Sequence, residues 1–287
     1  MMEKATDRRH AVDRREETQP SEILVTGGTG SLGSRVVDRL RDAGGGVRPM
    51  SRSGRDGTIR ADLLSGEGLE EALVGVDAVV HCASSPLRRT RQTDVEGTDR
   101  LLRAAERTSV SHFVYVSIVG VDSNPYYPYY PYYRVKLEVE RLVERSGVPW
   151  TILRATQFHE FVLKQIRFLE RGPLALAPKG FLFQPIETGE VADLLAELAL
   201  SAPAGRVPDV GGPEVRTAVD LTRSYLRATG RQKRVLELPI PGRMARAWRQ
   251  GAQVAPDHRY GRTTWEEFLG RTLHPSDTGR TARKVSA

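Results

Sequence analysis

Cysteine is almost missing from this chain, whose 287 residues contain only Cys82. One cysteine cannot form a disulfide within the chain, so a small fold held together by disulfides is excluded. The six histidines are scattered and form no cluster with metal-site spacing. We therefore expect no metal centre.

Long apolar runs and long runs of one charge are missing too. No apolar stretch approaches the roughly 18 residues of a membrane-spanning helix. The first residues are charged, unlike a secretory signal peptide, so we expect a cytoplasmic protein without membrane contact. The net charge is +7, but like charges are not grouped in long blocks, which favours solvated helix faces over a nucleic-acid surface.

The first half of the chain alternates two kinds of hydrophobic pattern. Residues 1–20 are rich in charge and poor in apolar side chains, which predicts a disordered tail. From Ser21 to residue 155, short apolar runs alternate with helical periodicity. We expect strands at 23–26, 47–51, 78–82, 113–117 and 150–153, with helices near 32–40, 95–105 and 135–143. This alternation predicts an α/β fold, a Rossmann-type doubly wound parallel sheet.

The second half is less regular. It predicts helices at 158–170, 190–200, 217–229, 242–250 and 264–269, with a short strand near 207–210. We interpret residues 156–270 as a smaller C-terminal substrate-side cap, interleaved with the sheet, and 271–287 as a flexible tail.

A glycine-rich turn follows the first expected strand. Gly28, Gly30 and Gly33 satisfy G-x-G-x-x-G, and Gly27 extends the pattern. Glycine allows a tight turn, close approach to a pyrophosphate and close packing of the next helix, whose N-terminus attracts phosphate. The alternative is an ordinary glycine-rich turn. The expected phosphate-binding residues are Gly27, Thr29, Gly30, Ser31, Leu32 and Gly33.

The end of the second expected strand reads Ser51-Arg52-Ser53. An NAD site has an acidic residue there, whereas a guanidinium pairs with the 2′-phosphate of NADP. The pattern therefore favours NADP(H), the alternative being a solvent-facing arginine. Asp62 and Leu63 are expected near the adenine, although Asp62 could instead cap a helix.

Tyr132 and Lys136 lie four residues apart at the start of an expected helix, hence on one face. An ammonium beside a phenol favours the phenolate, so such a tyrosine can transfer a proton to a substrate. Tyr132 lies in the last unit of a threefold Pro-Tyr-Tyr repeat at 125–133. The other tyrosines of the repeat would form either a stiff surface loop or an aromatic wall for the substrate.

Together these motifs resemble the NmrA-like, NAD(P)-binding branch of the atypical short-chain dehydrogenases/reductases. The resemblance extends over about residues 21–270. The matching stretches are 26–33, 79–83, 94–98, 115–122, 132–136, 153–158, 211–213 and 264–269.

The resemblance implies that Tyr132 is the general acid/base and Lys136 its partner, also able to hold the cofactor ribose. It implies that the cofactor is lined by His81, Cys82, Ala83 and Ser84, with Thr156 and Phe158 near the nicotinamide. Two positions depart from the family pattern. Ser117 is the candidate active-site hydroxyl, but Val119 takes the usual place, and Asp94 matches the helix asparagine of many relatives.

Three functions remain open from the sequence. The first is an NADPH-dependent oxidoreductase acting on a carbonyl or conjugated alkene of a small apolar or aromatic molecule. The second is a non-catalytic NADP(H)-sensing regulator that binds a protein partner. The third is a nucleotide-sugar epimerase or dehydratase. The first fits Tyr132 and Lys136 best, and we expect a monomer or homodimer.

Overall fold

The computed structural model describes residues 22–273 except 56, 87–88 and 124–130. The two predicted tails therefore lie outside the described residues, apart from 271–273 at the end of the last helix. Most of the Pro-Tyr-Tyr repeat also lies outside them.

A seven-stranded parallel sheet forms the larger half of the molecule, in the order β10-β6-β5-β4-β1-β2-β3. The predicted Rossmann-type α/β fold is confirmed. The strand order reverses between β1 and β4, and this switch point forms the ligand crevice in such sheets. The strands are β1 (Glu22–Thr26), β2 (Gly46–Ser51), β3 (Ile59–Arg60), β4 (Ala78–His81), β5 (His112–Ile118), β6 (Trp150–Ala155) and β10 (Gly205–Arg206).

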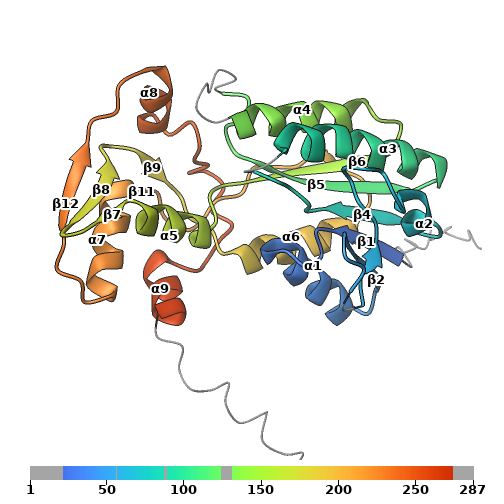
Figure 1. Cartoon of the computed structure of the whole chain (residues 1–287), viewed down its shortest axis with the longest axis horizontal. Coiled ribbons are helices and arrows are strands. Elements are labelled where there is room, and N and C mark those ends of the chain that lie inside the picture. Colours follow the sequence, from blue (N-terminus) through green and yellow to red (C-terminus); the bar gives the residue numbers. More distant parts are fainter. Residues whose placement is uncertain (1–21, 56, 87–88, 124–130, 274–287) are drawn as a thin grey trace, which may run out of the picture.

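Helices cover both faces of this sheet (Figure 1). One layer holds α1 (Ser31–Asp42) and α6 (Thr188–Ala199); the other holds α2 (Leu69–Leu73), α3 (Gly97–Arg107) and α4 (Pro131–Arg145). A π-helical turn, Arg91–Glu96, leads into α3. Because both faces are covered, the central strands are mostly apolar, as their short continuous runs predicted.

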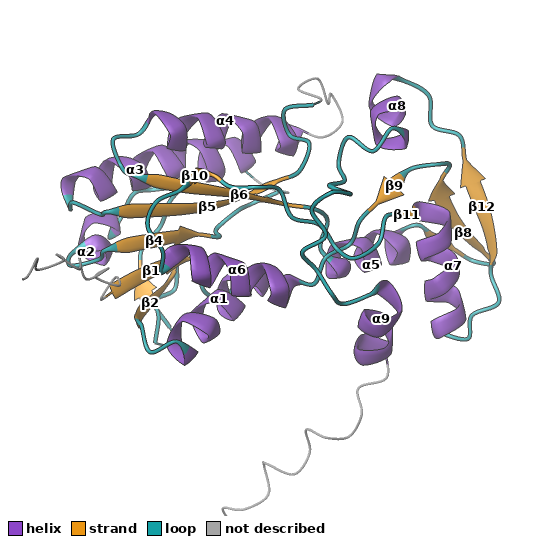
Figure 2. Cartoon of the chain, turned by 180° about the vertical axis from the view of Figure 1, so that it is seen from behind, coloured by secondary structure: helices purple, strands orange, loops and turns teal. Residues whose placement is uncertain are grey.

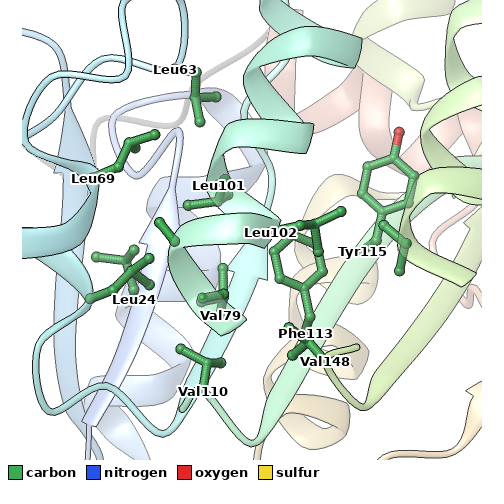
Figure 3. Packing of buried hydrophobic residues seen from close by; sticks show 14 of the residues in the cluster. Leu24, Leu63, Leu69, Val79, Leu101, Leu102, Val110, Phe113, Tyr115 and Val148 are labelled. Atoms are coloured by element: carbon green, nitrogen blue, oxygen red, sulfur yellow. The ribbon is translucent and has the colours of Figure 1, made fainter. Parts of the chain in front are cut away.

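The layer of α2, α3 and α4 encloses the larger apolar core. Phe113 and Tyr115 of β5 point toward it, beside Leu101 and Leu102 of α3 (Figure 3). Residues at alternate positions of the same strand, Val114 among them, face α1 and α6 instead. The side of β5 that carries Tyr115 is therefore the side on which α4 lies.

The cap lies beyond the carboxyl ends of the strands (Figure 2). The five helices predicted after residue 155 are confirmed as α5, α6, α7, α8 and α9. The strand predicted near 207–210 is wrong in position: β10 ends at Arg206, and Val210 makes only a single bridge with Ala155. The cap elements are α5 (His159–Phe168), β7 (Glu170–Arg171), β8 (Leu174–Pro178), β9 (Leu182–Phe183), β11 (Arg216–Thr217), α7 (Ala218–Ala228), β12 (Arg234–Leu238), α8 (Arg243–Arg249) and α9 (Trp265–Leu273).

Three buried glutamines hold together the cap loops that follow β6. The Gln157 side chain donates to the Gln253 carbonyl (2.8 Å) and accepts from the Gln184 amide (3.2 Å). The Gln184 side chain in turn donates to the Gly212 carbonyl (2.8 Å) and accepts from the Ala255 amide (2.7 Å). This glutamine cluster satisfies backbone groups of loops that no helix or strand pairs.

Candidate functional site

The glycine loop packs so closely that side chains would not fit. Gly27 has φ +64°, and a Cβ there would lie 2.9 Å from the backbone of Ala83. A Cβ on Gly28 would lie 2.7 Å from Pro49, and one on Gly33 only 2.2 Å from the Gly27 carbonyl oxygen. The turn after β1 therefore touches both the segment after β4 and the start of α1, as a dinucleotide loop requires.

The N-terminus of α1 is open to an anion. Gly30 is the N-cap and offers no side chain to the first amides, and the first turn carries no acidic residue. Thr29, Gly30 and Ser31 are exposed while Leu32 is buried beneath them. The free amides and the positive end of the helix dipole can therefore face a phosphate.

Arg52 follows β2 as an exposed side chain with no hydrogen bond or ion pair to another described residue. The neighbouring Ser51 hydroxyl lies 2.6 Å from the Thr58 hydroxyl and accepts the Gly54 amide at 3.2 Å. Ser53 is exposed beside it, with its hydroxyl 3.3 Å from that of Ser51. The guanidinium at this corner is thus available to a ligand.

Asp62 and Leu63 do not act as helix caps. The Asp62 carboxylate accepts the Leu64 amide at 2.9 Å, and α2 begins only at Leu69, with Gly68 as its N-cap. The alternative interpretation of Asp62 as a helix cap is therefore wrong. Leu63 is buried in the core, where a Cβ on Gly97 would meet it at 2.9 Å.

His81 lies in the interior behind the crevice. Its two ring nitrogens lie 2.7 Å from the Thr26 hydroxyl and 2.9 Å from the Thr98 hydroxyl. Burial, assisted by the Lys136 charge, lowers its pKa to about 3, so the ring is neutral. The ring therefore connects β1, β4 and α3, and its engaged nitrogens do not face a cofactor as the resemblance implied.

Cys82 follows His81 and packs partly into the core beneath α1. Burial raises the pKa of its thiol to about 12. The thiol therefore stays protonated and is not a nucleophile at neutral pH.

Lys136 is a buried ammonium. Only 5% of the residue is exposed, and its Nζ donates to the Val116 carbonyl at 3.0 Å. The Nζ lies 4.7 Å from the ring centre of Tyr115 and 5.7 Å from that of Tyr132. Burial opposes the charge, but the side chains of Tyr115, Tyr132 and Asp94 outweigh it and raise the pKa of Lys136. The side chain therefore remains a cation next to the Tyr132 phenol.

The Tyr132 hydroxyl belongs to a chain of three side chains. Its oxygen lies 2.8 Å from the Ser84 hydroxyl, which donates to the Asp94 carboxylate at 2.5 Å. The other carboxylate oxygen accepts the Ser85 amide at 2.8 Å. Asp94 is buried, and this burial raises its pKa despite the Ser84 and Ser85 hydrogen bonds and the Lys136 charge. Sequence reasoning gave Ser84 a cofactor contact and missed its bond to Tyr132.

Ser117 does not join this chain. Its hydroxyl is buried and makes no hydrogen bond of normal geometry with a described residue, yet it helps to lower the pKa of Glu140. The side chain therefore faces the Glu140 side of α4. Val119, the residue at the position expected for an active-site hydroxyl, is buried and apolar.

Glu140 belongs to a second polar cluster on α4. Arg154 of β6 contacts both Glu140 oxygens, at 2.8 and 2.7 Å, and donates to Asp122 at 2.8 Å. Arg206 donates to Glu140 at 3.0 Å. Desolvation raises the pKa of Glu140, but Arg154, Ser117 and Arg206 together hold it below its usual value. We call Glu140, Arg154, Arg206 and Asp122 the ion network.

The sequence profile of the NAD(P)H-binding family matches residues 27–202. The chain belongs to this NAD(P)H-binding family. The match begins at the glycine loop and continues through the Tyr132–Lys136 helix to the end of α6. The resemblance to the NmrA-like branch of the atypical short-chain dehydrogenases/reductases is thereby confirmed.

Curated relatives of this NAD(P)H-binding protein include reductases and assembly factors. The (4-alkanoyl-5-oxo-2,5-dihydrofuran-3-yl)methyl phosphate reductase of Streptomyces griseus subsp. griseus is 32% identical over 230 residues, covering 76% of this chain and 77% of its own length. The photosystem II assembly factor Ycf39 of Trieres chinensis is 26% identical over 233 residues, covering 76% and 72%. The family therefore spans enzymes and a protein named for assembly.

Solved structures share the fold. The NADPH-dependent quinone oxidoreductase QOR2 of Escherichia coli, complexed with NADPH, superposes with a TM-score of 0.71 at 18% identity, covering 88% of this chain and 99% of its own. A short-chain dehydrogenase/reductase superfamily protein of Agrobacterium tumefaciens with bound NAD gives 0.68 at 23% identity, covering 87% and 95%. Both likenesses support the fold alone.

The remaining predicted residues of this NAD(P)H-binding protein lie where β6 enters the cap. The Thr156 hydroxyl donates to the Gln184 carbonyl at 2.6 Å and is buried. Phe158 is half-buried as the N-cap of α5. The structure thus brings the glycine loop, Ala83, Ser84, Tyr132 and Lys136 together, while the Ser117 and Thr156 hydroxyls face other partners.

The described residues contain no candidate metal site and no membrane-spanning helix. No group of three or more histidine, cysteine, aspartate or glutamate side chains is arranged to hold a metal ion within them. In the same part of the chain, every helix is too short or too polar to cross a membrane.

Proposed function

We propose that this chain is an NADPH-dependent oxidoreductase with Tyr132 as proton donor. Its substrate is a carbonyl or a conjugated alkene of a small apolar or aromatic molecule. One observation carries the proposal: the glycine loop and Tyr132 contact the same short segment, Ala83 and Ser84. Gly27 packs on Ala83, and the next residue, Ser84, hydrogen-bonds the Tyr132 hydroxyl.

The residues at the switch point fit a dinucleotide. A Cβ on Gly27, Gly28 or Gly33 would collide with Ala83, Pro49 or the Gly27 carbonyl, so only glycine permits this tight dinucleotide-type turn, and the α1 amides beside it are uncapped. The exposed Arg52 guanidinium would pair with a 2′-phosphate. When bound, the nicotinamide would supply the hydride for reduction.

The chain's own groups would manage the proton. Tyr132 would donate its hydroxyl proton to the substrate atom that becomes negative. The buried Lys136 ammonium, held by the Val116 carbonyl, would stabilise the resulting phenolate. With both groups on the first turns of α4, one helix orients the acid and its supporting charge.

An apolar or aromatic substrate is supported by the side chains that surround the α4 start. Tyr133, Val121 and Phe181 form one apolar cluster with Trp248 of α8. The Trp248 ring lies 5.5 Å from that of Phe181. The names of two relatives fit the carbonyl or conjugated alkene instead: one specifies an alkanoyl-oxo-dihydrofuran that carries a methyl phosphate, and a 28% identical protein of Cucumis sativus is a divinyl chlorophyllide a 8-vinyl-reductase.

Tyr132→Phe tests this assignment. We expect kcat with NADPH and phenanthrenequinone or cyclohexenone to fall by about 100-fold or more, because the proton donor is lost. The NADPH dissociation constant, from fluorescence titration, should stay within about twofold. Tyr260→Phe, a half-exposed phenol elsewhere, is the control. Normal turnover by Tyr132→Phe would reject the proton-donor role.

Arg52→Glu tests the cofactor preference. We expect NADPH affinity to fall about 10- to 100-fold, because a charge-assisted contact to the 2′-phosphate becomes repulsive. NADH affinity should change little. Arg103→Glu, which alters an exposed arginine of α3, controls for the change in net charge. Equal losses for both cofactors would remove Arg52 from the 2′-phosphate site.

A non-catalytic NADP(H)-dependent regulator is the second candidate. Two observations favour it: the Ycf39 relatives and the absence of a hydroxyl at Val119. Such a protein would bind NADPH with unchanged affinity in the Tyr132→Phe variant and would turn over neither probe. Nucleotide-sugar chemistry receives no comparable support from the described residues.

A further inference from the structure

Three separate elements converge on the Tyr132 hydroxyl. Ser84 follows β4, Asp94 lies in the π-helical turn before α3, and Tyr132 lies in the first turn of α4. The oxygens form a continuous chain, with 2.8 Å from Tyr132 to Ser84 and 2.5 Å from Ser84 to Asp94. A proton can move along such a chain without any side chain changing place.

The direction of the chain depends on Asp94. A carboxylate only accepts, so an ionised Asp94 takes the single Ser84 proton, and the Ser84 oxygen must then accept from Tyr132. In that state the Tyr132 proton points toward Ser84 rather than toward a substrate. A protonated Asp94 donates to Ser84, Ser84 donates to Tyr132, and the Tyr132 proton is directed outward.

We propose that Asp94, acting through Ser84, is the proton reservoir of Tyr132 and sets the direction in which Tyr132 donates. This inference rests on the proposed reductase function. Asp94 is a positioning residue, since it acts on Tyr132 through its bond to Ser84.

The surroundings of Asp94 favour this role. The carboxyl is buried, and burial raises its pKa although Ser84, Ser85 and Lys136 each lower it. Tyr115 of β5 lies close enough for the Asp94 charge to contribute to the raised pKa of its hydroxyl.

The remaining charges on the same turn are engaged elsewhere. Arg91 pairs with Glu138, and Glu96 lies 3.8 Å from Arg100. Neither guanidinium, of Arg91 or of Arg100, therefore pairs with Asp94.

The transfer balances as follows. A bound nicotinamide would supply the hydride; as the substrate accepts that electron pair, the Tyr132 O–H bond would break and its proton would bond to the substrate. The Ser84 proton moves to the Tyr132 oxygen, and the Asp94 proton moves to the Ser84 oxygen. One proton leaves Asp94, which ends as a carboxylate and is reprotonated from solvent. Oxidation would run the same chain backward.

Infrared difference spectra of the full chain test the reservoir without any substrate. Subtracting Asp94→Asn from the wild type isolates the Asp94 carboxyl band. We expect its titration midpoint above the ordinary aspartate value of 3.8. Ser84→Ala should raise the midpoint further, because the carboxylate loses a donor. A midpoint at or below the ordinary value, or one unaffected by Ser84→Ala, would overturn the proposal.

The pH profile of reduction supplies the second arm, with NADPH and phenanthrenequinone. Above the Asp94 midpoint, wild-type kcat should fall about tenfold per pH unit as the acid form is lost. In Asp94→Asn, Ser85 holds the amide oxygen, so the amide nitrogen donates to Ser84. That variant should lose the pH limb and about 10- to 100-fold in kcat, with NADPH affinity unchanged. Asp99→Asn, on the exposed side of α3, is the control.

The outcomes separate the two proposals. If Tyr132→Phe is inactive while Asp94→Asn keeps the wild-type pH limb, the reservoir is rejected and the reductase function stands. If Tyr132→Phe turns over normally, the proton-donor function fails and the reservoir fails with it. Loss of the limb in Asp94→Asn, with Tyr132→Phe inactive, supports both.

Discussion

Helix α4 carries two buried charges one turn apart, and they are treated in opposite ways. Glu140 is fully buried and contacts two guanidiniums, with two hydrogen bonds from Arg154 alone. Lys136, equally hidden, contacts one carbonyl and two aromatic rings, with no ion pair to a described residue. A buried ion pair with its hydrogen bonds satisfied fixes the local side-chain arrangement. A buried charge without a counter-ion shifts the pKa values of adjacent groups, which is typical of a reactive site.

Glu140→Gln should produce the largest change. It leaves Arg154 buried beside a neutral amide, since Asp122 is half-exposed and covers only one side. We expect the free energy of unfolding in urea to fall by about 3–5 kcal/mol. Glu138→Gln alters an exposed pair on the same helix and should cost less than about 1 kcal/mol. Equal losses of stability in Glu140→Gln and Glu138→Gln would show that the buried ion network is no more important for stability than the exposed pair.

Lys136→Met should do the reverse of Glu140→Gln and affect turnover much more than stability. The buried ammonium has no ion-pair partner among the described residues, so its loss should change the unfolding free energy by about 1 kcal/mol or less. Turnover with NADPH and either probe should fall about 100-fold or more, because the Tyr132 phenolate loses its cation. A strongly destabilised but active Lys136→Met protein would place Lys136 with the structural group.

The pH dependence of stability should also distinguish Glu140 from Lys136, with a smaller effect. The pKa values of Glu140 and Asp122 are both held below their usual values, 4.5 and 3.8, by Arg154. Their stabilisation is complete above the unfolded values and is lost as pH falls through the lower folded ones. We expect Glu140→Gln to flatten the loss of stability between about pH 5 and about pH 2 by roughly 1 kcal/mol. Lys136→Met should retain the wild-type slope there.

Much of the sheet follows from local patterns, whereas the small cap sheet does not. The continuous apolar runs at β1, β4 and β5 predicted those strands within one or two residues. Strands β8 and β12 lie side by side in parallel although some sixty residues separate them. Each strand has only five residues, and β12 has no buried residue, so neither stands out against its neighbours. Long-range pairing, not local preference, creates them.

The site residues also fall into those that local sequence predicts and those that it does not. Gly27, Gly33 and the Tyr132–Lys136 spacing are predictable because turn sterics and helical periodicity act locally. The partner of Ser84 is not, because it depends on how the π-helical turn and α4 meet over β4. Ser117 lies on the strand face predicted to serve the site, but the α4 register sets Glu140 against it. Side-chain partners across elements need the packed structure.

The glutamine cluster has a consequence for unfolding. Gln157 lies two residues beyond β6, yet its amide holds a carbonyl 96 residues later. The bonds of all three glutamines run between residues 157 and 255, so opening one of the loops that they hold would strand buried amide groups of the others, and these cap loops are expected to unfold together. A chain cut after Ala155 would keep the whole cluster in its second piece, and a cap moved onto another sheet would need Gln157, Gln184 and Gln253 as a set.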